Sequence, residues 1–150
     1  MENRSAEIVR RMYRDFDDGN LDAVAAAMTP DVVFHAPGGA PFSGRRVGRE
    51  QVLQRFQEIR RLVRIDQFDV DEILADKDKV VALGRQRAMV RATGRHFEQE
   101  FAHVYSMRGD KVSAVHLFGD TYAVASAFDE SPAERGALTG PLGVTEPPFR

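Results

Sequence analysis

The first part of the chain carries hydrophobic residues at helical spacing. The earliest of them lie four residues apart and so share one face of a helix: Ile8, Met12 and Phe16. A short alanine-rich helix is predicted for residues 21–28, and Pro30 ends it because proline disfavours the helical conformation at the residue before it. A third helix is predicted for residues 52–63, after a short strand at 32–35 and a Pro- and Gly-rich loop at 36–44.

From residue 65 onward the apolar positions alternate with a period of two. This pattern predicts four long strands, over residues 65–75, 79–93, 96–107 and 111–122. The turns between them are short and polar, and such hairpin connections indicate a mostly antiparallel sheet. Because the helices precede most of the strands, we expect an α+β fold in which a curved sheet wraps three helices.

Length and charge limit what this fold can do. A chain of 150 residues suits one domain, predicted over residues 1–128, followed by a Pro- and Gly-rich tail at 129–150 that we expect to be flexible. Lys and Arg number 21 against 23 Asp and Glu, and the acidic excess lies in the tail, so residues 1–128 hold 19 of each. A neutral body argues against nucleic-acid binding and favours an uncharged lipophilic ligand.

Other compositional features concern location. The chain has no cysteine, no run of about 18 apolar residues and a polar N-terminus. We therefore expect no membrane span, no secretion signal and a cytoplasmic protein.

Two blocks of opposite charge adjoin within the neutral body. Residues 45–64 hold seven arginines against two glutamates, and residues 66–78 hold six acids against one lysine. The basic block could form an anion site on its helix. The favoured interpretation is that a helix face and a sheet edge, or two subunits, neutralise each other.

Histidine and carboxylate side chains are the candidates for acid–base chemistry. His116, Phe118 and Asp120 share one face of the last predicted strand, and a hydrophobic setting would raise the pKa of such an aspartate. His35 ends the first predicted strand, directly before the flexible loop. We interpret His103, which lies among aromatic residues of its strand, as a packing or dimer-interface residue. No His or carboxylate cluster has metal-ligand spacing, so neither a metal nor a cofactor is expected.

Five segments carry a resemblance to a known family: residues 18–22 (DGNLD), 27–34 (AMTPDVVF), 37–39 (PGG), 43–50 (SGRRVGRE) and 108–112 (RGDKV). Together they resemble the nuclear transport factor 2-like superfamily, in its SnoaL-like (polyketide-cyclase-like) branch, over roughly residues 3–128. The resemblance implies a cone-shaped α+β barrel, in which a strongly bent sheet and three helices enclose a deep apolar pocket. It also implies a homodimer formed through the outer face of the sheet.

The resemblance further implies a cofactor-independent enzyme that acts by acid–base chemistry on a small hydrophobic carbonyl compound, as an isomerase, cyclase or dehydratase. Asp120 would move the proton, His35 would assist it or stabilise an enolate, and His116 would line the same pocket. The ligand would be bound by six further residues: Tyr13, Phe16, Phe56, Ala102, Val104 and Phe118.

Two alternatives stay open. The catalytic residues of ketosteroid isomerases are not reproduced, since Ala102 precedes His103 where those enzymes carry an aspartate, and this favours a non-catalytic binding or dimerisation module of the same fold. An epoxide-hydrolase-like enzyme is the second alternative. There Asp120 matches one acid and Arg85 the arginine, but Arg87 replaces the other acid.

Overall fold

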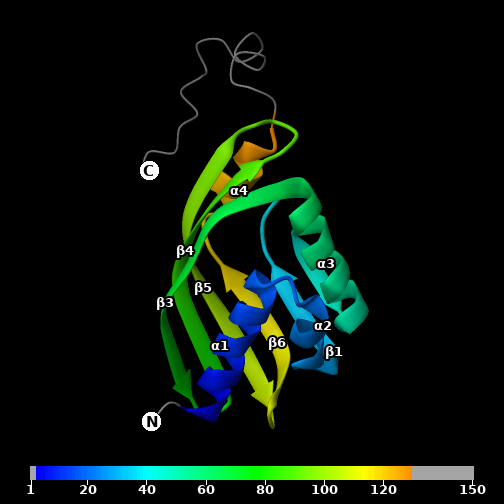
Figure 1. Ribbon diagram of the computed structural model, residues 1–150, viewed down its shortest axis with the longest axis vertical. Helices are drawn as coiled ribbons and strands as arrows, with labels where there is room; N and C mark the ends of the chain where they lie inside the picture. Colours follow the sequence, from blue (N-terminus) through cyan, green and yellow to red (C-terminus); the bar gives the residue numbers. More distant parts are fainter. Residues whose placement is uncertain (1–2, 130–150) are drawn as a thin grey trace.

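A six-stranded sheet forms the frame of the protein, in a computed structural model that describes residues 3–129 (Figure 1). The strand order is β2-β1-β6-β5-β4-β3. Only β1 and β6 pair in parallel, and the other neighbours in the described sheet are antiparallel. The elements are α1 (Arg4–Asp17), α2 (Leu21–Ala26), β1 (Met28–Ala36), β2 (Gly44–Val47), α3 (Arg49–Leu62), β3 (Val63–Asp76), β4 (Lys79–Val90), β5 (His96–Arg108), β6 (Lys111–Phe118) and α4 (Thr121–Ala127). The predicted α+β class and mostly antiparallel sheet are confirmed.

Asparagine side chains begin the first two helices. Asn3 Oδ1 accepts a hydrogen bond from the backbone N–H of Ser5 at 2.7 Å, and Asn20 Oδ1 accepts one from Ala23 at 3.3 Å. Of the predicted stripe of α1, Met12 is buried, and Ile8 and Phe16 are partly buried against the core. Local sequence is therefore sufficient to fix where these helices start and which face they bury.

Beyond small shifts at the ends of other elements, three larger differences from the prediction are seen. Strand β2 lies at the end of the predicted loop; it has only four residues of alternating partial burial, too short a pattern to recognise. Helix α2 stops at Ala26, and residues 28–36 form β1 instead. The last predicted strand ends early, at Phe118, because Asp120 accepts a hydrogen bond from Ala123 N at 2.9 Å and so caps α4.

Three of the four described helices lie together on one face of the sheet. In Figure 1, α1, α2 and α3 stand in front of the strands, while α4 lies near one end of β5. The sheet residues that face these helices are the buried members of each alternating strand, such as Phe97 and Tyr105 of β5. This inner face of the sheet therefore carries the core.

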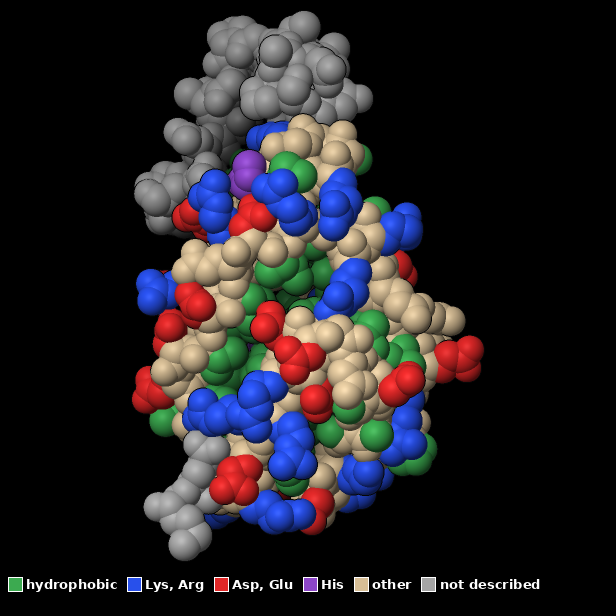
Figure 2. Space-filling model, viewed as in Figure 1, with side chains coloured by type: hydrophobic (Ala, Val, Ile, Leu, Met, Phe, Trp, Pro, Cys, Tyr) green, Lys and Arg blue, Asp and Glu red, His purple; other side chains and the backbone are tan. Residues whose placement is uncertain are grey.

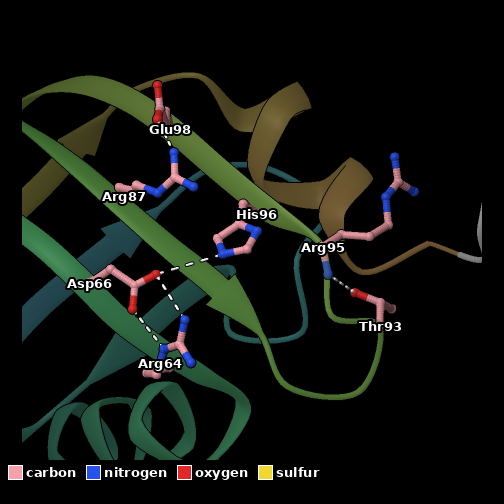
Figure 3. A network of polar contacts seen from close by, with 7 residues as sticks. All are labelled: Arg64, Asp66, Arg87, Thr93, Arg95, His96 and Glu98. Atoms are coloured by element: carbon pink, nitrogen blue, oxygen red, sulfur yellow. Dashed lines mark hydrogen bonds and ion pairs between the residues drawn. The ribbon is translucent and has the colours of Figure 1, made fainter.

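Oppositely charged residues pair across the edge of the sheet formed by β3, β4 and β5. Arg64 Nε donates to Asp66 at 2.6 Å, and His96 Nε2 lies 3.8 Å from the same carboxylate (Figure 3). Arg87 pairs with Glu98 across β4 and β5 in the same view. The Arg64–Asp66 pair joins the ends of the two charge blocks, so neutralisation between the blocks is seen at this point.

A glycine in β4 permits the close approach of its two neighbouring strands. A β-carbon at Gly84 would lie 2.1 Å from the carbonyl oxygen of Asp69 in β3 and 2.6 Å from the ring of Phe101 in β5. We expect Gly84→Ala to lower the free energy of unfolding by about 1–3 kcal/mol, because the backbone oxygen has to move. Urea denaturation measures this change.

Gly39→Ala is the matched control. A β-carbon there meets only the side chain of Ala125, at 3.9 Å, which is ordinary van der Waals contact. We expect this variant to be as stable as the wild type or slightly more stable. Equal destabilisation by both substitutions would contradict the role assigned to Gly84.

Candidate functional site

A cavity of about 160 Å3 lies between the inner face of the sheet and the helices. Its wall is mainly aromatic and aliphatic, with contributions from every layer: Phe16, Phe34, Phe56, Phe68, Phe101 and Leu117. Thr121 and Val124 of α4 also line it, together with the loop residues Pro37 and Phe42. A cavity of similar size holds a benzene-sized molecule, so the site suits a small, mostly apolar ligand.

A chain of three polar side chains crosses from α1 to β5 inside this apolar wall. Tyr105 donates a hydrogen bond from its hydroxyl to the hydroxyl of Tyr13 at 2.6 Å. The Tyr13 hydroxyl lies 2.8 Å from Nδ1 of His103. The His103 ring also stacks on Phe101, with ring centres 4.1 Å apart. All three polar residues line the cavity, and the stacking fixes the plane of the imidazole.

Burial keeps His103 neutral. It lowers the pKa of the imidazole from 6.5 to about 3, and the positive charge of Arg55 acts in the same direction. Burial also raises the pKa of Tyr13 well above its ordinary value, so that this phenol stays protonated. When Tyr13 accepts the hydrogen bond from Tyr105, its own hydroxyl proton can be donated to Nδ1 of His103. In that tautomer the ring proton lies on Nε2.

Nε2 of His103 is the open end of this chain. It has no hydrogen-bond partner among residues 3–129. It is also not fully buried, so part of its surface is accessible. The partly accessible surface of His103 therefore belongs to the cavity that the ring lines. The site consequently presents a neutral N–H donor of fixed orientation to whatever occupies the cavity.

Two glutamines on neighbouring strands line the cavity, Gln99 of β5 and Gln86 of β4. Asp120 N donates to Gln99 Oε1 at 3.0 Å, and Gln99 Nε2 donates to Gln86 Oε1 at 3.1 Å. Gln99 lies four residues before His103 on the same strand face, roughly 13 Å away along the strand. The cavity thus has two separate polar ends joined by an apolar middle.

A buried arginine completes the wall. Arg55 of α3 stacks on Phe34, with its guanidinium carbon 4.6 Å from the ring centre, and donates from Nε to the carbonyl oxygen of Phe42 at 3.3 Å. Burial lowers its pKa from 12.5 to about 9, so it remains charged at neutral pH. No Asp or Glu of the described residues lines the cavity.

Four of the residues expected to bind the ligand do line this cavity: Tyr13, Phe16, Phe56 and Phe118. Phe118 stands at its edge, since its side chain is half exposed and its ring stacks on His116. The other five expected site residues are not part of the lining: His35, His116, Asp120, Ala102 and Val104.

Successive side chains of a strand point to opposite faces of the sheet, and this alternation directs most of those five residues away from the cavity. His116 is paired with Val104, whereas its neighbour Leu117 is paired with His103 and lines the cavity. His35 lies between two cavity-lining residues of β1 and contacts His116 across the strands, with Nδ1 and Nε2 3.1 Å apart. The expected placement of these residues in the pocket is therefore corrected: they lie on the outer face, where the dimer contact was expected and stays a prediction.

The expected position of the Asp120 side chain is corrected for a different reason. Its carboxylate is exposed and caps α4, so it does not enter the cavity with His35 as expected. The Arg85 side chain of the epoxide-hydrolase-like alternative is also exposed and lies 3.6 Å from Asp71. Neither acid–base pair suggested by the sequence is assembled inside the cavity.

The sequence held a signal for the residues that were missed. Residues 97, 99, 101, 103 and 105 alternate as Phe, Gln, Phe, His and Tyr, and all five line the cavity. An aromatic strand face with a histidine within it is typical of packing, which is why His103 was interpreted in that way. Only the Tyr13 contact from α1 distinguishes it from a core histidine.

Within residues 3–129, no group of three or more His, Asp or Glu side chains is arranged to hold a metal ion. None of the helices in the described part of the chain is long and apolar enough to cross a membrane.

Because the folded protein holds His103 neutral, its stability should depend on pH. The unfolded chain takes up a proton at this residue near pH 6.5, whereas the folded chain does so only near pH 3. Stability is therefore fully present above pH 6.5 and is lost as the pH falls. Between pH 6.5 and about pH 4.5 we expect His103→Gln to remove about 2 kcal/mol of the wild-type decrease in the free energy of unfolding.

Urea denaturation at a series of pH values measures this difference. His96→Gln, which removes an exposed imidazole, is the matched control. Parallel pH profiles for the wild type and His103→Gln would contradict a neutral buried ring.

Comparison with known proteins supports the fold directly. An NTF2-like protein from Burkholderia xenovorans matches with a TM-score of 0.79 and 24% identity, over 84% of this chain and 96% of that one. A protein from Bacillus subtilis, provisionally assigned as an isomerase, matches with a TM-score of 0.73 and 18% identity, over 85% and 94% of the two chains. A protein from Mesorhizobium loti, provisionally assigned as a SnoaL-like polyketide cyclase, gives 0.65 and 16%, over 75% and 97%.

Among curated proteins, no significant match is found. The model of the SnoaL-like domain matches residues 9–115, which is most of the described chain. The sheet order, the helices on its inner face and the cavity between them agree with this match. The chain therefore belongs to the SnoaL-like domain family and has the NTF2-like fold.

Proposed function

We propose that this protein is a cofactor-independent enzyme that isomerises or cyclises a small hydrophobic carbonyl compound in the cavity. The observation that carries the proposal is the neutral His103 ring, held at Nδ1 by Tyr13 and open to the cavity at Nε2. The provisional assignments of two structural relatives, as an isomerase and as a polyketide cyclase, are consistent with this reaction class.

The reaction follows from what the three polar side chains can do. Nε2–H of His103 donates a hydrogen bond to the carbonyl oxygen of the substrate and stabilises the negative charge that develops there. Tyr13 holds the imidazole in the tautomer that places a proton on Nε2, and Tyr105 holds Tyr13. Because the low pKa keeps the ring neutral, the donor is present at every pH above about 3.

The proton that leaves the substrate does not need a carboxylate in this scheme. A carbonyl whose oxygen is stabilised in this way has a more acidic neighbouring C–H bond, and water can remove that proton. A substrate that is already ionised to its enolate needs no base, since its carbon attacks a carbonyl polarised by His103. The C=O π bond breaks as the C–C bond forms, and the resulting alkoxide takes a proton from water. Both routes fit a cavity whose described lining contains neither Asp nor Glu.

Hydrogen exchange tests this function without knowledge of the natural substrate. The probe is 2-tetralone, a hydrophobic ketone, and the measurement is exchange of its α-hydrogens for deuterium in D2O, followed by NMR. We expect the wild type to accelerate exchange, and His103→Leu to lower the protein-dependent rate about 100-fold by removing the donor. Tyr13→Phe should lower it about tenfold, because the ring then loses control of its tautomer.

Asp120→Asn is the matched control, because asparagine caps a helix as well as aspartate does. We expect this variant to retain the wild-type exchange rate. Loss of exchange in Asp120→Asn but not in His103→Leu would overturn the proposal and return the proton transfer to Asp120.

Non-catalytic binding is the second candidate function. The low pKa of His103 makes it a weak base, and no carboxylate of the described residues lines the cavity. If the protein only binds its ligand, we expect the C=O stretching frequency of bound 2-tetralone to shift downward in the wild type and not in His103→Leu. The α-hydrogens of 2-tetralone should then exchange no faster than in buffer.

A further inference from the structure

Arg55 is the one Lys or Arg side chain of the described residues that lines the inner cavity, and it is 5% exposed. Its contacts are a hydrogen bond to one carbonyl oxygen and the faces of Phe34 and Phe42, whose ring centres lie 4.6 and 5.7 Å from the guanidinium carbon. The Nη atoms form no hydrogen bond within residues 3–129 and are not sealed off, so they retain access to the cavity. The planar fork that would recognise an anion is therefore still available.

No acidic side chain of the described residues forms an ion pair with Arg55. The acid that acts on it most, Glu58, accepts hydrogen bonds from both Nη atoms of Arg46 at 3.4 Å. The three side chains together carry one uncompensated positive charge. A buried cation without a charged partner is unfavourable. An anion that enters the cavity would therefore be stabilised by forming the ion pair that the described residues do not supply to Arg55.

A second observation concerns the surface next to the cavity. A groove of about 650 Å3 lies between α1 and β3 and shares five lining residues with the inner cavity: Tyr13, Phe16, Val63, Ile65 and Phe68. Five arginines and one aspartate line this basic groove: Arg10, Arg14, Arg60, Arg64, Arg91 and Asp17. In Figure 2, the face that carries α1 and α3 shows a hollow of hydrophobic side chains, with Lys and Arg around it and acidic side chains among them and at its lower rim.

The overall charge conceals this arrangement. Residues 1–128 are neutral in sum, but the groove that adjoins the cavity is lined by five arginines against one aspartate, and of these arginines Arg64 is paired with Asp66. A concave surface of one sign attracts ligands of the opposite sign and raises their rate of association. The groove and Arg55 thus point independently to the same ligand charge.

We infer that the ligand of the inner cavity is a hydrophobic anion, whose single negative charge, on the oxygen of a carboxylate or of an ionised enol, pairs with Arg55. This inference rests on the proposed function, because it names the substrate class of the same site. An ionised enol would also supply the carbon nucleophile without a base, while His103 polarises the second carbonyl.

Paired probes that differ only in charge test the inference. The carboxylate arm compares 4-ethylbenzoate with neutral 4-ethylbenzamide, and the enol arm compares ionised 2-hydroxy-1,4-naphthoquinone with its neutral methyl ether. Calorimetry at neutral pH measures each Kd. We expect the anion of at least one pair to bind the wild type about 30-fold more tightly than its neutral partner, and the tighter arm identifies the source of the negative oxygen.

Arg55→Met should remove this preference, and Arg55→Lys should restore part of it, because lysine keeps the charge without the planar fork. Arg61→Met removes an exposed arginine from the same helix and is the matched control, expected to keep the preference. Equal binding of the anionic and neutral probes by the wild type in both arms would overturn the inference, even if Arg55→Met does not fold.

The two proposals fail in different ways. If the wild type prefers anions but does not accelerate exchange in 2-tetralone, the anion site is supported and the proposed enzyme is rejected. If the wild type accelerates exchange but binds anionic and neutral probes equally, the proposed enzyme is supported and the anion site is rejected.

Discussion

The chain of hydrogen bonds from Tyr105 through Tyr13 to His103 is the constraint on which the site depends. These polar groups lie in an otherwise apolar wall, where an unmade hydrogen bond would be costly. Satisfying them requires α1 to lie over β5 at one register, since Tyr13 has to meet two side chains of the same strand. The same contact fixes the ring orientation and tautomer of His103, so packing and site geometry have one cause.

Arg55 shows the opposite situation, because residues 3–129 bury its charge without providing a carboxylate for it. The faces of Phe34 and Phe42 accommodate the guanidinium, but its charge faces the cavity. In the same low-polarity space this charge helps to keep His103 neutral. An anionic ligand would offset the charge of Arg55 and leave His103 as a neutral donor, so the two residues have complementary roles in one site.

Charge counting led to a different expectation at first. The equal numbers of acids and bases in residues 1–128 favoured an uncharged ligand, because a sum contains no information on position. Folding separates the charges: acids such as Asp71 and Glu98 pair with arginines outside the cavity, while Arg55 is the one Lys or Arg side chain among residues 3–129 that lines it. The basic block on α3 was interpreted as self-neutralising, and the Arg64–Asp66 pair fits that interpretation, whereas Arg55 does not.

The sequence by itself determined the first three helices, the long strands, the α+β class and the family, since these depend on local periodicity and on short turn motifs. Three helix residues that the resemblance assigned to the pocket, Tyr13, Phe16 and Phe56, do line the cavity. Only the tertiary structure decided which face of each strand is the inner one. A strand presents two faces with a period of two, and the pairing of β1 with β6 selects Leu117 rather than His116 for the cavity. Because that selection depends on contacts between residues far apart in the chain, no local pattern could separate His103 from His116.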